Sequence, residues 1–201
     1  LGVLFGLTLA FIANDTWSAH DKATGAVYRE ADALRSLLVL SGKLDEPLRP
    51  TIRATLGRYA QASSEEWDCL AQRRSSPHAD LQANALLLAV IDRRIEDQLG
   101  RTVHALMLSK VSDIRHDRDL RIALSQMHVN PLKWLGMAFL GLLTLLSIAM
   151  VHIENPRAAY LSIALFALSA APTAAIVLVQ GNPFLQPSFV SPAPIIAALG
   201  P

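Results

Sequence analysis

Residue types that could perform catalysis or bind a metal are present, but their spacing matches none of the usual sites. The single cysteine, Cys69, has no evident base near it in the sequence, so we interpret it as a small apolar contact rather than a nucleophile. The six histidines are scattered over polar stretches and the ends of apolar segments, without the paired spacing of a zinc site. We interpret all six as surface residues.

Motifs for phosphate binding and acyl transfer are also missing from the sequence. The glycines near the N-terminus lack the strand–turn–helix context of a phosphate loop, and no serine sits in a nucleophile elbow. We therefore expect no catalytic residue, no cofactor and no metal, and we expect that the protein is not an enzyme. A formal net charge of +1 gives no bulk attraction to nucleic acid, so no nucleic-acid partner is expected.

The densest charged stretch, residues 112–121, permits two interpretations. It contains Asp113, Asp117 and Asp119, which could form a cation-binding or regulatory site. Calcium loops, however, deliver their oxygen ligands from a turn that contains a glycine, whereas this stretch has a helical pattern with interleaved arginines. We favour a solvated helix face and keep the cation or regulatory site as the alternative.

Two long apolar segments predict a membrane hairpin at residues 132–180. Residues 134–151 and 158–179 carry no charge, and only six residues separate them. A helix needs about 20 apolar residues to cross the hydrocarbon core of a bilayer. We predict spans at 132–152 and 157–180, a lipid bilayer as the surroundings, and Gly136 and Gly141 as points where helices approach closely.

Residues 1–13 are apolar apart from Thr8, but they are too few to cross a bilayer. We interpret them as the C-terminal part of a transmembrane helix that continues into water and stops near Ser41–Gly42, with Trp17 as an interfacial anchor. If the protein is an oligomeric channel, this helix lines the pore. Polar groups at membrane depth are needed there, so the pore-lining candidates are Thr8, Asn14 and Thr16.

The middle of the chain, residues 14–130, predicts an all-helical polar domain. It holds 16 of the 18 Lys and Arg residues and 16 of the 17 acids. Helices are expected after Pro47 and after Pro77, with Ser76 as the cap of the latter and Gly100 as a weak point within it. Their apolar faces are expected at two sets of positions: Leu48, Ile52, Leu56, Tyr59, Ser63 and Trp67, and Leu88, Ile91, Ile95, Leu99, Val103 and Leu106.

The last segment, residues 181–201, is rich in proline. Pro183, Pro187, Pro192 and Pro194 exclude a regular helix before Ile195. We expect an extended segment that packs on the protein or on the membrane surface. Phe184 and Phe189 would suit the membrane interface.

Lys and Arg residues near the ends of the apolar segments predict the orientation. They flank the middle domain, whereas the hairpin loop holds Arg157 alone. The positive-inside rule then places the middle domain and the C-terminus in the cytoplasm. We expect a multi-pass protein of the bacterial inner membrane.

Several short motifs occur in an order that resembles the bestrophin-like domain proteins of bacteria and plants. The resemblance covers nearly the whole chain, and its most specific part is the tail. The motifs are Glu30-Ala31-Asp32-Ala33-Leu34, Tyr59 followed by Glu66-Trp67, Arg121 with Pro131 and Trp134, His152-Ile153-Glu154-Asn155, and Asn182-Pro183-Phe184 with Val190-Ser191-Pro192.

The resemblance implies four spans, with the helical cytoplasmic domain inserted between the second and the third. By the family's name it also implies kinship with pentameric anion channels, hence a homo-oligomer and a permeating anion. No residue of this chain aligns with the calcium clasp or the aromatic pore neck of true bestrophins. A non-conducting membrane sensor or scaffold, which uses the soluble helices to bind proteins, therefore stays open as the alternative, and a transporter is a weaker third hypothesis.

Overall fold

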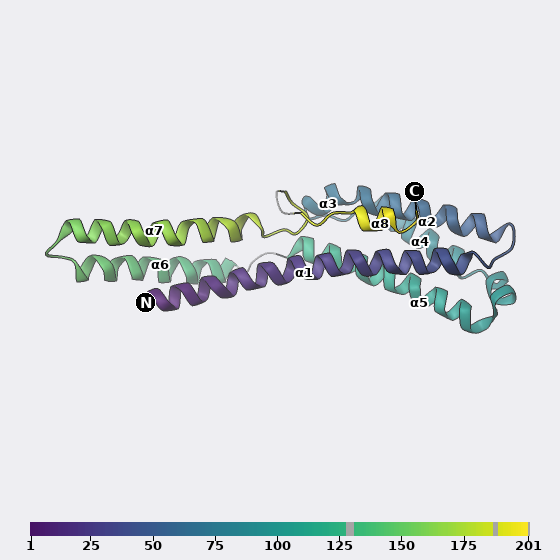
Figure 1. Ribbon diagram of the computed structural model, residues 1–201, viewed down its shortest axis with the longest axis horizontal. Helices are drawn as coiled ribbons and strands as arrows, with labels where there is room; N and C mark the ends of the chain where they lie inside the picture. The colour runs from purple at the N-terminus through teal and green to yellow at the C-terminus, as the bar shows by residue number, and fades with distance from the viewer. Residues whose placement is uncertain (128–130, 187–188, 201) are drawn as a thin grey trace. The chain divides into compact units, whose positions relative to one another are not determined.

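The computed structural model describes residues 1–127, 131–186 and 189–200, and every regular element in these ranges is a helix (Figure 1). Residues 128–130 of the predicted polar domain and Pro187 lie outside them.

The chain divides into two compact units. The first contains residues 1–20 and 127–182, and the second contains residues 21–126 and 183–201. The helices are α1 (Gly2–Ser41), α2 (Leu48–Glu65), α3 (Trp67–Ala71), α4 (Pro77–Val90), α5 (Arg93–Gln126), α6 (Pro131–Val151), α7 (Pro156–Val179) and α8 (Ala193–Ala197).

The long first helix is confirmed, because α1 runs without a break from Gly2 to Ser41. In the second unit its inner face buries Val27, Ala31 and Leu34, which repeat at the spacing of one helix face. The chain then turns within a few residues and leads into α2.

The second unit is a helical bundle in which α2 packs against α4 and α8, while α3 and α4 pack against α5. The predicted inner face of α2 is confirmed, because all six positions named above are buried. The predicted cap is also confirmed: the Ser76 side chain accepts a hydrogen bond of 3.4 Å from the Ala79 amide at the start of α4.

The predicted single helix through Leu88 and Leu106 is wrong, but the expected weak point at Gly100 is confirmed. The helix ends at Val90, and α5 starts at Arg93 and has a non-helical residue at Gly100, with φ of 78°. A positive φ suits glycine because it has no Cβ atom. This interruption shifts the register, so that Leu88, Ile91 and Leu106 are exposed, whereas His104 and Met107 are buried.

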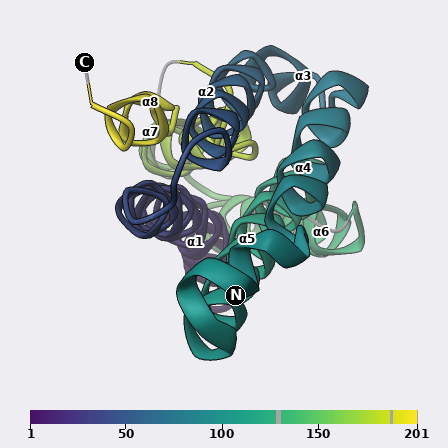
Figure 2. The ribbon, with the colours of Figure 1, turned by 90° about the vertical axis from the view of Figure 1, so that its right-hand side faces the viewer.

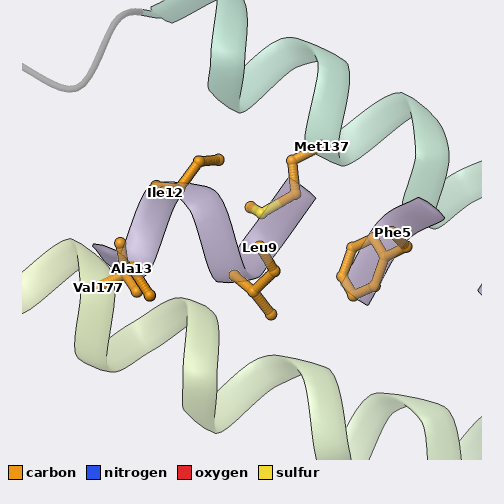
Figure 3. Packing of buried hydrophobic residues seen from close by; sticks show 6 residues of the cluster. All are labelled: Phe5, Leu9, Ile12, Ala13, Met137 and Val177. Carbon is orange, nitrogen blue, oxygen red and sulfur yellow. The ribbon is translucent and has the colours of Figure 1, made fainter. Parts of the chain in front are cut away.

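In the first unit, α1 packs between α6 and α7 through apolar side chains (Figure 3). The buried cluster consists of Phe5, Leu9, Ile12, Ala13, Met137 and Val177. The Phe5 ring lies against Gly141, where a Cβ atom would be 3.3 Å from the ring, so the predicted close approach at Gly141 is confirmed. At Gly136 no atom lies within 4 Å of the corresponding position among the described residues.

Two polar contacts lie at the end of this apolar cluster. Asp15 pairs with Lys133 at 2.6 Å, and the indole N–H of Trp17 donates to the Gln180 side chain at 3.2 Å. Charged and amphipathic side chains of this kind mark the boundary of a membrane. Both contacts join α1 to the ends of the hairpin helices.

The C-terminal segment belongs to the second unit. The expectation that Phe184 rests at the membrane interface is wrong. Its side chain is buried, and its ring meets that of Trp67 edge-on, with 5.7 Å between the ring centroids. Edge-to-face aromatic pairs at this distance are favourable.

Candidate functional site

The centre of the second unit is a fully buried ion pair between Glu30 and Arg121. Arg121 Nε donates to Glu30 Oε2 at 2.7 Å, and Arg121 Nη2 donates to Glu30 Oε1 at 3.1 Å. Two parallel hydrogen bonds fix the orientation of both planar groups. Helix α1 therefore presents its carboxylate to α5 across a sequence separation of 91 residues.

Helix α2 completes the shell around the Glu30 carboxylate. The hydroxyls of Tyr59 and Ser63 donate to Glu30 Oε1 at 2.8 and 2.9 Å. Ser63 also accepts a hydrogen bond of 2.7 Å from Arg121 Nη2. The buried carboxylate thus has hydrogen-bond partners on both α2 and α5, as a buried charge requires.

A second buried pair, Arg118 with Glu66, lies one helical turn along α5. Arg118 Nη2 donates to Glu66 Oε1 at 2.6 Å, and its Nε donates to Glu66 Oε2 at 3.0 Å. Arg118 also contacts Asp80 of α4 at 2.5 Å, and the Ser76 amide donates to Glu66. Since Glu66 lies between α2 and α3, this pair ties α2, α3, α4 and α5 together.

Trp67 connects the ion pairs to the C-terminal segment. The Arg121 guanidinium lies 4.6 Å from the centroid of the Trp67 ring, which is the geometry of a cation–π contact. The indole N–H of Trp67 donates to the Val190 carbonyl at 2.6 Å. We call the residues Glu30, Tyr59, Ser63, Glu66, Trp67, Arg118 and Arg121 the buried ionic network.

The interpretation of residues 112–121 as a solvated face is wrong for Asp117, Arg118 and Arg121, which are all buried. A signal was present in the sequence, because the apolar periodicity of α5 continues through the charged residues. Positions at steps of 4, 3, 4, 3 and 4 are all buried: Met107, Val111, Ile114, Arg118, Arg121 and Ser125. Glu30 likewise follows Val27 on the inner face of α1.

The charges of the network balance, with two buried guanidinium groups against two buried carboxylates. Burial lowers the pKa of Arg121, but the charges of Glu30 and Glu66 and the hydrogen bonds to Glu30 together outweigh that effect and raise the pKa above its ordinary value. Within the described residues Arg121 Nη1 has no hydrogen-bond partner, and it lies 3.9 Å from Glu66 Oε2. Buried ion pairs add little net stability over apolar residues but are costly to break. We therefore expect the network to determine which helices pair and in what register.

Tyr59 is expected to remain protonated in the folded protein at a pH at which exposed tyrosines ionise. Burial raises the pKa of its hydroxyl well above the ordinary value of about 10, and the negative charge of Glu30 raises it further. The stability that the buried, protonated Tyr59 hydroxyl contributes is therefore fully present below about pH 10 and is lost as the pH rises above that value. Absorbance at 295 nm of the wild type and Tyr59→Phe checks this prediction at pH 10–11.

The two proteins should show equal tyrosinate absorbance while folded, because Tyr59 does not contribute. After unfolding in denaturant at the same pH, the wild type should gain the absorbance of one additional tyrosinate. An excess in the folded wild type would show instead that Tyr59 ionises in place.

The other side chains that could react or bind a metal lie apart from one another among the described residues. Cys69 is a free, partly buried thiol. The expectation of surface histidines is wrong for His104, whose Nε2 lies 2.8 Å from the Val90 carbonyl in a buried position. Within the described ranges, no three or more His, Cys, Asp and Glu side chains are grouped so as to hold a metal ion. Asp117 instead pairs with Arg29 at 2.6 Å.

The three pore-lining candidates do not form one stripe on α1. The Thr8 hydroxyl donates to the Leu4 carbonyl and is half-buried, Asn14 is exposed, and Thr16 is buried with its hydroxyl donating to Ile12. Successive helix residues are 100° apart, so Asn14 and Thr16 point to nearly opposite sides. Of these residues, Asn14 has the side chain that is open to surroundings outside this chain.

Comparison with known proteins gives a family and a fold. A family model of the bestrophin-like domain matches residues 1–195. A crystal structure described as that of a membrane protein has the same fold, with a TM-score of 0.75 and 15% sequence identity over 100% of this chain and 85% of that chain. No curated protein matches the sequence.

Proposed function

This chain belongs to the bestrophin-like domain family, and from that premise we propose that it is a multi-pass membrane protein that assembles from several copies and conducts anions. The observation that carries the membrane assignment is the exposure of the hairpin helices. Residues 132–151 and 156–179 each have a mean hydropathy of 2.1. Nevertheless, only 11% and 6% of the most apolar 18-residue stretch of each helix is buried. Apolar surface of that extent requires lipid or another apolar partner.

The start of α1 supports the same assignment. Its inner face packs on α6 and α7, whereas Val3, Leu7 and Phe11 on other sides are exposed. A helix that is apolar all round is buried in a core or a membrane. We place the second unit in the cytoplasm, because its basic residues flank the apolar segments.

In this proposal the anion path runs along α1 past Asn14, because Thr8 and Thr16 do not lie on one stripe with it. A pore needs hydrogen-bond donors that replace part of the hydration shell of the ion. The Asn14 amide offers two N–H donors and is exposed, so it is the strongest of the three candidates. The buried ionic network holds the cytoplasmic helices in register.

The protein reconstituted in liposomes is expected to release trapped chloride faster than protein-free liposomes. Asn14→Leu should reduce this rate roughly tenfold, which corresponds to a barrier about 1.4 kcal/mol higher. A chloride-selective electrode measures the efflux. Gln186→Leu, a change of the same type at an exposed tail position, is the matched control and should leave the rate unchanged.

A non-conducting sensor or scaffold is the second candidate function. It is favoured by the exposed apolar side chains of Leu81 and Leu88 on α4, in the unit that carries nearly all of the charged residues. Absence of chloride efflux from liposomes that contain inserted, folded oligomers would favour the scaffold and contradict the channel.

A further inference from the structure

The interruption of α5 at Gly100 brings two ionisable side chains together. His104 Nδ1 lies 3.7 Å from Glu96 Oε2. In an unbroken helix these two positions would be about 12 Å apart along the axis, and side chains meet at spacings of three or four residues. The non-helical conformation of Gly100, with φ of 78° and ψ of 159°, therefore accounts for the contact. The chain passes from α4 into α5 at the end of the second unit that faces the viewer in Figure 2.

Both ring nitrogens of His104 face oxygen atoms that only accept hydrogen bonds. Nε2 lies 2.8 Å from the carbonyl oxygen of Val90, the last residue of α4. Because a carbonyl has no hydrogen to give, Nε2 carries one. The neutral ring then presents a lone pair at Nδ1 to the Glu96 carboxylate, whereas the protonated ring donates at both nitrogens. Both contacts are satisfied together only when the ring carries two hydrogens.

The exposure of the side chains indicates which contact of Glu96 is the stronger one. The His104 side chain is 10% exposed and that of Glu96 is 39% exposed, so water screens their contact only in part. Arg101 Nε also lies near the carboxylate, at 3.4 Å from Glu96 Oε1, but the Arg101 side chain is 91% exposed. An ion pair with so exposed a partner contributes little. The contact of Glu96 that depends on pH is therefore the one with His104.

Charged groups of the neighbouring helices lie far from His104. The ionisable residues of α4, His78 and Asp80, are in its first turn, about 15–18 Å along the helix from Val90. Among the described residues, the ion pairs that join α5 to other elements begin at Asp117, about 20 Å further along α5. Neither set reaches the contact between Glu96 and His104.

Charged groups in the turns at this end of the second unit have other partners. Asp92, just before α5, pairs with Arg94 at 2.6 Å. In the turn between α1 and α2, Arg49 Nε donates to the Leu44 carbonyl at 2.7 Å. A change in the charge of the His104 ring is therefore felt mainly by Glu96.

We propose that Glu96 and His104 form a pH-sensitive ion pair that holds residues 93–99 in place across the break at Gly100. Protonation of His104 Nδ1 closes the pair, and loss of that proton opens it. Histidine is the side chain that ordinarily changes charge between pH 5 and 8. The stability that the pair contributes is therefore present at the acidic end of this range and is lost as the pH rises through it.

The same segment contacts the turn that joins α1 to α2. The amide N–H of Asp45 donates to Gln98 Oε1 at 3.0 Å. Ile95 is fully buried, so the segment has an apolar anchor that does not depend on pH. Opening of the ion pair should therefore loosen residues 93–99 and their contact with the turn, without unfolding the second unit.

Hydrogen exchange of the full chain in detergent micelles, followed by mass spectrometry, tests the ion pair. Glu96→Gln removes the charge and nearly keeps the size of the side chain. At pH 5.5, residues 93–99 of the variant should exchange about threefold faster than those of the wild type, as expected for a modest ion pair. At pH 8.5 the two proteins should exchange at nearly equal rates. Comparison at one pH cancels the effect of pH on the exchange reaction itself.

Two further variants identify the partner of Glu96. His104→Gln keeps a donor for the Val90 carbonyl but gains no charge, so the addition of Glu96→Gln to it should not change the exchange at pH 5.5. Asp97→Asn removes a neighbouring exposed carboxylate and is the matched control, which should exchange as the wild type does. An effect of Glu96→Gln that is the same at both pH values would assign the carboxylate to Arg101 and overturn the proposal. So would equal exchange of Glu96→Gln and the wild type at pH 5.5, or an equal effect of Asp97→Asn.

Discussion

Arg121→Met is expected to lower the free energy of unfolding of the second unit by about 3–5 kcal/mol, because it leaves the buried Glu30 carboxylate without its counter-charge. Both side chains are fully buried, so water cannot replace the lost partner. Methionine fills much of the volume of the arginine side chain, which keeps the cavity contribution small. Denaturant titration of the protein in detergent micelles, followed by far-UV circular dichroism, measures the effect.

A double-mutant cycle separates the loss of the pair from the loss of packing. Glu30→Leu alone should also be strongly destabilising, because it leaves Arg121 charged and unpaired. The double variant Glu30→Leu/Arg121→Met should be destabilised less than the sum of the single variants, by about 2–3 kcal/mol. Strictly additive effects would mean that the two groups do not interact as the structure indicates.

Arg94→Met is the matched control for the arginine substitution. Arg94 pairs with Asp92 at 2.6 Å, a distance similar to that of the buried pair, but its side chain is 64% exposed. Exposed pairs are screened by water and contribute little. The denaturation midpoint of Arg94→Met should match that of the wild type.

Trp67→Ala is expected to lower the free energy of unfolding of the second unit by about 3–5 kcal/mol. It should also release the C-terminal segment from that unit. The ring covers Arg121, meets Phe184 edge-on and donates its N–H to Val190, so its removal breaks all three contacts. Hydrogen exchange followed by mass spectrometry should show faster exchange in residues 189–200 of the variant.

Trp67→Phe separates the hydrogen bond from the packing. Phenylalanine keeps an aromatic ring but leaves the Val190 carbonyl without its donor. This should lower the free energy of unfolding by about 1–3 kcal/mol. Trp17→Phe is the matched control, since it removes the same indole N–H donor at an exposed position, where the acceptor is Gln180. Unchanged exchange in Trp67→Ala would contradict the role of this residue in holding the segment.

Much of the local structure followed from the sequence. Helix periodicity and capping chemistry are local properties, so they predicted α1, the buried face of α2 and the Ser76 cap. The break before α5 was missed because residues 88–91 continue an apolar pattern without a proline or glycine to end it. Leu88 and Ile91, which are exposed, were therefore counted as part of a buried face.

The buried ionic network could not be predicted from local sequence patterns. Arg118 and Arg121 stand in a charged run, and their carboxylate partners lie 52 and 91 positions away. Nothing local distinguishes such arginines from solvated ones except the periodicity that continues through them. The family motifs held more information, because Glu30, Tyr59, Glu66-Trp67, Arg121, Phe184 and Val190 all meet in and around this network. In the proposed channel, the pore-lining residues would be defined by neighbouring copies, which neither local sequence patterns nor a single chain can reveal.

The native mass of the wild-type protein in lipid nanodiscs tests the central proposal most directly. An anion path that runs along α1 between neighbouring copies requires assembly. We predict one discrete mass equal to a whole multiple of the chain, larger than one copy and unchanged on dilution. A single copy per nanodisc under conditions that keep the helices folded would contradict the account.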